Sequence, residues 1–178
     1  MSNKEANPIF LVGMMGAGKS TVGKCLAERL GMDFVDLDEE LERRCGVSIP
    51  FIFREEGEEG FRRRESALIE EFTRAKGLVV ATGGGAVTQE KNRTLLKNAP
   101  IFTVHLKVSA EQCYRRTKNS DRPLLQCENP LEKITLLLES RNPLYGEVAS
   151  LTVDTDGKAS KRVAEELNQT FINLQVIK

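Results

Sequence analysis

The sequence has no tryptophan, only one histidine, and no excess of charge of either sign. Lys plus Arg and Asp plus Glu both total 26 in 178 residues, so the formal net charge is zero. This balance argues against a global electrostatic attraction to nucleic acid or to an anionic membrane. Local basic runs such as "FRRRE" (61–65) are therefore candidate binding sites or solvated helix faces.

The cysteines lack metal-binding spacing. Cys25, Cys45, Cys113 and Cys127 form no CxxC pair, and with His105 as the single histidine they do not predict a zinc site. Unpaired thiols are typical of a reducing compartment. The start "MSNKEANP" has no apolar signal segment, and no apolar run reaches the length of about 18 residues that a membrane span needs. We therefore expect a cytoplasmic protein without a membrane partner.

The pattern of elements indicates one α/β domain over residues 1–178. Short apolar strands alternate with helices, which predicts a layered fold with a parallel sheet. The predicted strands are 9–12, 33–38, 77–82, 101–106 and 151–154. The predicted helices are 20–31, 39–46, 48–53, 59–76, 109–117, 130–141 and 159–174, with an irregular segment at 118–129.

The stretch "GMMGAGKST" (13–21) lies between the first predicted strand and the first predicted helix. It matches G-x-x-x-x-G-K-[ST] in the context that this nucleotide-binding motif requires. Backbone N–H groups of such a loop converge on phosphate oxygens at a helix N-terminus. Lys19 can reach the β- and γ-phosphates, and Ser20 can offer a hydroxyl to Mg²⁺. The residues expected to bind ATP here are Gly16, Ala17, Gly18, Lys19, Ser20 and Thr21.

A nucleotide-binding loop alone does not separate kinases from GTPases, motors or regulatory ATPases. The third predicted strand ends in Thr82 and three glycines, so it supplies no carboxylate for a magnesium shell. The nearest carboxylates at a strand end are Asp36 and Asp38. We therefore expect Mg²⁺ to be held by Ser20, phosphates and water, with Asp36 as a ligand through water.

Seven segments, in order along the chain, resemble those of the shikimate kinase family. They are "GMMGAGKST", "DLD" (36–38), "SIPFIF" (48–53), "GEEGFRRRE" (57–65), "GGGAV" (83–87), "DRPLL" (121–125) and "RNPLY" (141–145). The resemblance covers roughly residues 9–155. It implies a three-layer P-loop fold like that of nucleoside monophosphate kinases, with strand order 2-3-1-4-5 and a mobile lid at about 116–129. It also implies a monomer that uses ATP and Mg²⁺ to phosphorylate the 3-hydroxyl of shikimate, a step in aromatic amino acid biosynthesis.

Shikimate is a small ring that carries one carboxylate and three hydroxyls. A guanidinium binds a carboxylate through two parallel hydrogen bonds, so Arg62 and Arg141 are the candidates for this group. Because Arg63 and Arg64 follow Arg62, the sequence alone leaves a solvated helix face as the alternative. The resemblance favours substrate binding, and it places a shikimate-binding segment at about 38–65.

Asp38 has two interpretations that can coexist. It precedes "EEL" and could cap the short helix by accepting a backbone N–H. The resemblance implies that Asp38 holds the substrate hydroxyls and accepts the proton of the attacking one. Phosphoryl transfer through a loose transition state gains mostly from positioning and charge stabilisation, so the proton transfer contributes less.

Three consecutive glycines, Gly83, Gly84 and Gly85, follow the third predicted strand. Open α/β sheets bind their ligands at the carboxyl ends of their strands. Bare backbone there would let a polar ring come close, with the Gly84 N–H directed at a substrate oxygen. A bulge or tight turn that uses the positive φ available to glycine is the alternative.

The irregular segment contains Arg122, which closure of the loop could bring to the phosphates while excluding water. A surface arginine is the alternative. With Lys19 and Asp38, Arg122 completes the expected catalytic set. The resemblance implies that Arg116 stacks on adenine, and Lys158 lies where the family has a variable adenine-binding loop.

Two aromatic residues, Phe53 and Phe61, could line the apolar side of the ring site or simply belong to the core. His105 lies inside a strand away from every motif, and we expect it to be a packing residue.

Two other functions remain open from the sequence. A gluconate or nucleotide kinase could use the same scaffold, and Arg62 and Asp38 do not exclude it because gluconate is also a polyol acid. The combination of "GGGAV" with "RNPLY" favours shikimate. A regulatory module that has lost catalysis should have lost Lys19, Asp38 or Arg122, and all three are present.

Overall fold

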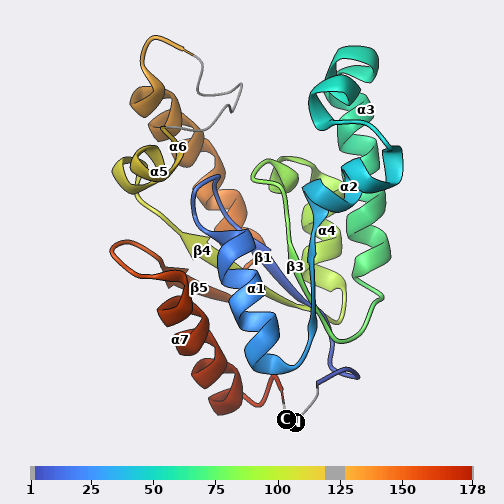
Figure 1. Cartoon of the computed structure of the whole chain (residues 1–178), viewed down its shortest axis with the longest axis vertical. Coiled ribbons are helices and arrows are strands. Elements are labelled where there is room, and N and C mark those ends of the chain that lie inside the picture. Colours follow the sequence, from blue (N-terminus) through green and yellow to red (C-terminus); the bar gives the residue numbers. More distant parts are fainter. Residues whose placement is uncertain (1–2, 119–126, 178) are drawn as a thin grey trace.

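The computed structural model describes residues 3–118 and 127–177. In these residues five strands form one parallel sheet of order β2-β3-β1-β4-β5 (Figure 1). The strands are β1 (Ile9–Val12), β2 (Asp33–Asp36), β3 (Leu78–Ala81), β4 (Phe102–Lys107) and β5 (Leu151–Asp154). The strand order expected from the family resemblance is therefore confirmed.

Helices cover both faces of this sheet. They are α1 (Lys19–Leu30), α2 (Leu37–Cys45), α3 (Ile49–Phe72), α4 (Glu90–Asn98), α5 (Ala110–Thr117), α6 (Pro130–Val148) and α7 (Ser160–Asn173), with a 3-10 turn η1 (Ala86–Thr88). α1 and α7 pack together on one face, and α3, α4 and α6 lie on the other (Figure 1). Right-handed crossovers place α1 on the face opposite to α3, α4 and α6, because the chain crosses the sheet in opposite directions after β1 and after β2. Among the helices of the described residues, none has both the length and the apolarity needed to traverse a membrane.

The central strand β1 anchors the core. Ile9–Val12 are all 0% exposed, as expected for an apolar run that is covered on both faces. Val22, Leu26 and Leu30 recur every four residues on α1 and are buried in the same core. The loop that joins β1 to α1 is therefore held at both ends by buried elements.

The junction of β2 and α2 differs from the sequence prediction. β2 ends at Asp36, two residues earlier than predicted, and α2 begins at Leu37. The Asp36 carboxylate accepts hydrogen bonds from the backbone N–H groups of Asp38 (3.0 Å) and Glu39 (3.5 Å), which is the N-cap arrangement. The capping role considered for Asp38 thus belongs to Asp36. Asp38 lies in the first turn of α2 instead.

Three helices also depart from the prediction. α3 is assigned as one helix across two predicted ones, and it bends at Gly57, whose φ of 68° and ψ of −176° are not helical. α6 continues seven residues beyond the predicted end at Arg141. Pro143 lies inside this helix, where it removes one N–H donor, yet the helix does not end there. α4 lies in a stretch where the sequence analysis predicts no helix.

Candidate active site

The loop between β1 and α1 has the conformation of a phosphate-binding loop. Gly16 and Gly18 have φ of 77° and 92°, in the region that side chains disfavour. A Cβ at Gly16 would also lie 2.9 Å from Cγ2 of Thr117, on α5. The loop therefore needs glycine both for its backbone conformation and for its close packing against α5.

Lys19 is held at the mouth of this loop. Its ammonium donates hydrogen bonds to the carbonyl oxygens of Gly13 (2.7 Å) and Met14 (3.0 Å), and the residue is only 9% exposed. The charge is thus positioned by the protein before any nucleotide is bound.

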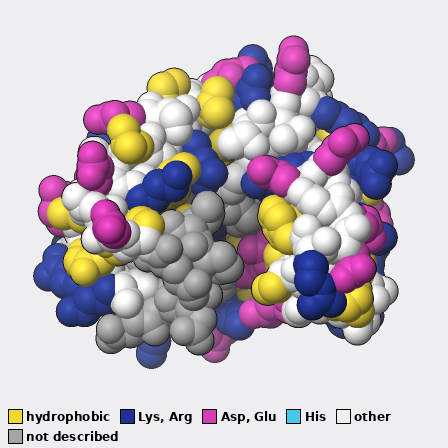
Figure 2. Space-filling model, turned by 90° about the horizontal axis from the view of Figure 1, so that it is seen from above, with side chains coloured by type: hydrophobic (Ala, Val, Ile, Leu, Met, Phe, Trp, Pro, Cys, Tyr) yellow, Lys and Arg dark blue, Asp and Glu magenta, His cyan; other side chains and the backbone are white. Residues whose placement is uncertain are grey.

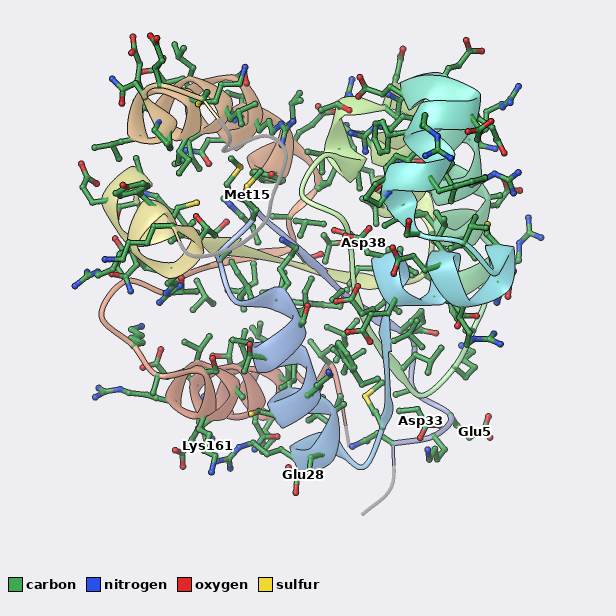
Figure 3. The ribbon with its side chains drawn as sticks, turned by 45° about the horizontal axis from the view of Figure 1, so that its top comes forward. Glu5, Met15, Glu28, Asp33, Asp38 and Lys161 are labelled. Atoms are coloured by element: carbon green, nitrogen blue, oxygen red, sulfur yellow. The ribbon has the colours of Figure 1, made fainter. Side chains whose placement is uncertain are left out.

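A cavity of about 540 Å³ opens at the carboxyl edge of the sheet. This volume is in the range of small-ligand sites. Figure 2 looks down on this edge and shows a hollow with basic and acidic side chains at its rim. Figure 3 shows Met15, in the phosphate loop, and Asp38, at the start of α2, at the same edge. The cavity is lined by Met15–Val22, Asp36, Asp38, Thr82, Gly84, Arg116, Thr155, Lys158–Ser160 and Val163.

The predicted metal-binding pair is in contact. The Ser20 hydroxyl donates a hydrogen bond to Oδ2 of Asp36, while Oδ1 of the same carboxylate caps α2. Mg²⁺ usually takes one or two carboxylates, phosphates and waters rather than a closed protein cage. In residues 3–118 and 127–177 no group of three or more His, Cys, Asp or Glu side chains is arranged to hold a metal ion. An open Ser20–Asp36 site beside the phosphate loop fits such an ion.

Arg116 connects the phosphate loop to the loop after β5. Its guanidinium donates to the carbonyl oxygens of Gly16 (3.0 Å) and Thr155 (2.8 Å), and the residue is exposed. Because these hydrogen bonds use the edge of the guanidinium, its flat face stays available for stacking. Lys158 also lines the cavity, where it forms an ion pair with Glu166 at 2.7 Å.

The three glycines do not use the conformational freedom of glycine. None of Gly83, Gly84 and Gly85 has a positive φ, so the interpretation as a turn with positive φ is wrong. A Cβ at Gly84 would lie 3.2 Å from the backbone nitrogen of Met15, so this glycine packs against the phosphate loop. The absence of side chains is therefore what the fold requires here.

The other two glycines face charged side chains. A Cβ at Gly83 would lie 2.7 Å from Oε1 of Glu65 and 3.1 Å from Oδ1 of Asp38. A Cβ at Gly85 would overlap the guanidinium of Arg62, with Nη1 at 2.9 Å. The bare backbone of the triplet thus brings two carboxylates and one arginine to the same place.

Arg62 is not on a solvated helix face. Its side chain is 13% exposed and pairs with Glu65 at 2.7 Å and with Glu58 at 3.3 Å. Its guanidinium also lies over the Phe61 ring, 5.1 Å from the centroid. The alternative that the sequence left open for Arg62 is therefore wrong.

Glu65 is a residue of the site that the sequence analysis missed. Its side chain is 2% exposed, and burial raises its pKa while the Arg62 guanidinium opposes that rise. In the described part of the chain, Oε1 of Glu65 has no hydrogen-bond partner, and it faces Gly83. The available signal was its position three residues after Arg62, on the same helical face.

Arg141 reaches the same region from α6. Burial raises the pKa of both Glu65 and Tyr145, and the charge of Arg141 opposes that rise in each. Tyr145, one turn after Arg141, donates its hydroxyl to the carbonyl oxygen of Gly84 at 2.5 Å. Tyr145 was quoted in "RNPLY" but was given no role by the sequence analysis.

The aromatic residues divide between site and core. Phe61 is buried and stacks on Phe53, which is 38% exposed, with ring centroids 4.7 Å apart. His105 is buried and stacks on Tyr145, which confirms its prediction as a packing residue. Arg122 lies outside the described residues.

A solved kinase of low sequence identity has the same fold. A solved gluconokinase from Sinorhizobium meliloti aligns over 98% of both chains with a TM-score of 0.57 and 19% identity. At that identity the likeness shows the fold alone. It gives the gluconate alternative no support beyond the common scaffold.

Closer similarities agree on one family. The family model described as shikimate kinase matches residues 15–172. A shikimate kinase of Thioalkalivibrio sulfidiphilus is 49% identical over 94% of this chain and 88% of its own. The solved shikimate kinase of Acinetobacter baumannii, in complex with shikimate, covers 96% of this chain and 95% of its own with a TM-score of 0.91 and 47% identity. With the phosphate loop, the glycine triplet and the buried arginine in one site, the chain belongs to the shikimate kinase family.

Proposed function

We propose that this protein transfers the γ-phosphoryl group of ATP to the 3-hydroxyl of shikimate, giving ADP and shikimate 3-phosphate for aromatic amino acid biosynthesis. The observation that carries the proposal is the continuity of the site. One cavity extends from Lys19 and Ser20 to Asp38 and Gly84. Arg62 lies directly behind the same glycine triplet. Phosphate donor and ring acceptor would therefore meet at this edge of the sheet.

A coupled ADP-release assay tests this function. Shikimate, gluconate and a panel of nucleoside monophosphates are offered at equal concentrations with ATP. We expect kcat/KM for shikimate to exceed that for every other acceptor by about 10⁴-fold, because unpaired polar groups in the site penalise an acceptor of the wrong shape. A comparable rate with gluconate would reject shikimate as the specific substrate.

On the acceptor side of the site, each charged side chain has its own role. Arg62 and Arg141 bind the carboxylate of shikimate, each as a planar fork of donors. Asp38 accepts hydrogen bonds from the ring hydroxyls and takes the proton of the attacking one. Glu65 holds Arg62 in place by the 2.7 Å ion pair. Phe53 and Phe61 supply the apolar side of the ring site, and the residues that surround it form the acceptor-binding segment at about 38–65.

The conservative change Arg62→Lys tests the carboxylate assignment. An ammonium keeps the charge but cannot reproduce the two-pronged contact. We expect the KM for shikimate to rise about tenfold, which corresponds to about 1.4 kcal/mol for a charge-assisted hydrogen bond. The KM for ATP should stay within about twofold.

Arg63→Lys is the matched control, because Arg63 is the next residue and is exposed. It should change neither KM. If Arg62→Lys weakens ATP as much as shikimate, Arg62 serves the nucleotide site or the frame of the protein instead.

On the donor side, Lys19 contacts the β- and γ-phosphates, and the backbone of Gly16–Thr21 surrounds them. Ser20 and Asp36 would hold Mg²⁺, Asp36 through water. When bound, Mg²⁺ neutralises charge on the phosphate oxygens. Arg116 stacks on adenine, Lys158 lies beside it, and Arg122 reaches the phosphates when a lid at about 116–129 closes. We also propose that the protein acts as a cytoplasmic monomer, with its single domain comprising the whole chain.

A further inference from the structure

The buried hydroxyl of Tyr145 is hydrogen-bonded to the backbone of the glycine triplet. Tyr145 is 1% exposed, and its ring stacks on His105 with centroids 5.0 Å apart and planes at 28°. Its hydroxyl donates to the carbonyl oxygen of Gly84 at 2.5 Å, across 61 positions of sequence. A buried hydroxyl is costly without a partner, so this bond fixes where α6 meets the triplet.

All three carbonyl groups of the triplet have donors. The Gly83 oxygen accepts from the N–H of Ala86 (3.1 Å). The Gly85 oxygen accepts from the N–H of Thr88 (3.0 Å) and from its hydroxyl (2.7 Å). These bonds lie within the turn itself. The Gly84 oxygen differs, because its donor comes from α6.

The N–H groups of Gly84 and Gly85 are left for another acceptor. In the hydrogen bonds of residues 3–118 and 127–177, neither of them donates to a protein atom. In a planar trans peptide the carbonyl of Gly84 and the N–H of Gly85 point in opposite directions. By holding that carbonyl toward α6, the Tyr145 hydroxyl directs the Gly85 N–H away from α6.

The same hydroxyl is linked to Arg141 and, through Gly84, to the phosphate loop. Arg141 lies one turn earlier on α6, and its charge opposes the effect of burial on the Tyr145 hydroxyl. Burial nevertheless raises the pKa of Tyr145 to about 12, so the hydroxyl stays protonated at neutral pH. On the other side, a Cβ at Gly84 would lie 3.2 Å from the backbone nitrogen of Met15. Tyr145 is therefore connected to the donor loop through Gly84.

We propose that Tyr145 is a positioning residue for phosphoryl transfer. Its hydroxyl fixes the Gly84–Gly85 peptide, and with it the backbone N–H of Gly85, relative to the phosphate loop. It acts through this peptide rather than by touching shikimate. The inference rests on the proposed assignment of the triplet to the shikimate site.

Tyr145→Phe is the direct test, because it removes the hydroxyl and keeps the ring that stacks on His105. We expect the KM for shikimate to rise about tenfold, as for a buried acceptor left without its donor, with the KM for ATP within about twofold. Tyr114→Phe, at the only other tyrosine of the chain, is the control and should change neither constant. A shikimate KM within about twofold of the wild type, or equal losses for both substrates, would overturn the proposal.

A second variant separates the hydroxyl from the packing of the ring. Incorporation of 3-fluorotyrosine into the Tyr114→Phe chain labels position 145 alone, because the sequence has two tyrosines. This residue keeps a hydroxyl donor, so the shikimate KM should stay within about twofold of the wild type. A loss as large as that of Tyr145→Phe would assign the effect to ring packing and reject the positioning role.

Arg62→Lys, measured in the same assay, distinguishes a failure of the proposed substrate site from a failure of the Tyr145 role. If it leaves the shikimate KM unchanged, the assignment of the substrate site fails, and the Tyr145 inference fails with it. If Arg62→Lys weakens shikimate but Tyr145→Phe does not, the substrate site stands and only the positioning role is rejected.

Discussion

Replacing Lys19 by alanine is expected to lower kcat about 10³-fold, the upper range for removing one preorganised donor to transition-state charge. The ammonium is fixed by the carbonyl oxygens of Gly13 (2.7 Å) and Met14 (3.0 Å). It therefore meets the transferring phosphoryl group without reorganisation. Since little covalent chemistry is required of the protein in phosphoryl transfer, the loss of a fixed charge falls mainly on kcat.

The measurement is the coupled ADP-release assay at saturating ATP and shikimate. Lys24→Ala is the matched control, because Lys24 carries the same charge on the same helix but is exposed. It should retain full kcat. Lys19→Ala also removes two hydrogen bonds to the phosphate loop, so its thermal unfolding is followed in parallel. A folded Lys19→Ala protein with near-normal kcat would contradict the assigned role.

The donor side of the site was predictable because its geometry is local. The loop is one contiguous segment, so the spacing of Gly13, Gly18 and Lys19 already specifies a strand, a turn and a helix start. The sequence analysis assigned Ser20 and Asp36 to one magnesium site, and the structure joins them by a hydrogen bond. Sheet order came from the family resemblance, and the structure confirms it.

The acceptor side depends on tertiary contacts that no local pattern encodes. The bond from Tyr145 to Gly84 joins residues 61 positions apart. The buried pair of Arg62 and Glu65 sits in a highly charged run, "EEGFRRRE" (58–65), that resembles an exposed face, and only packing shows otherwise. The capping role considered for Asp38 belongs to Asp36, because the end of β2 and the start of α2 lie two residues earlier than the sequence pattern predicts.

The glycine triplet offers the second large effect, at Gly85. A methyl group at Gly85 would overlap the Arg62 guanidinium, with Nη1 at 2.9 Å. The flexible end of Arg62 would have to give way rather than the backbone, and a φ of −96° at Gly85 suits alanine. We therefore expect Gly85→Ala to raise the KM for shikimate about 100-fold, near the upper cost of losing a charge-assisted contact. The melting temperature should fall by only about 1 °C, as for a change of a few tenths of a kcal/mol.

Two other glycine-to-alanine variants test whether this result is specific to Gly85. Gly84→Ala would bring a methyl group to 3.2 Å from the backbone nitrogen of Met15, so it should raise the KM for ATP as well as that for shikimate. Gly146→Ala, where a Cβ meets nothing within 4 Å, should change neither. Titration with each substrate and thermal unfolding without ligand distinguish the three variants. If Gly85→Ala instead unfolds at a clearly lower temperature and binds shikimate normally, the bare backbone serves the turn and not the substrate. The predicted pattern, weak shikimate binding in a stable protein, requires that the space beside Gly85 be kept for Arg62 in its binding position.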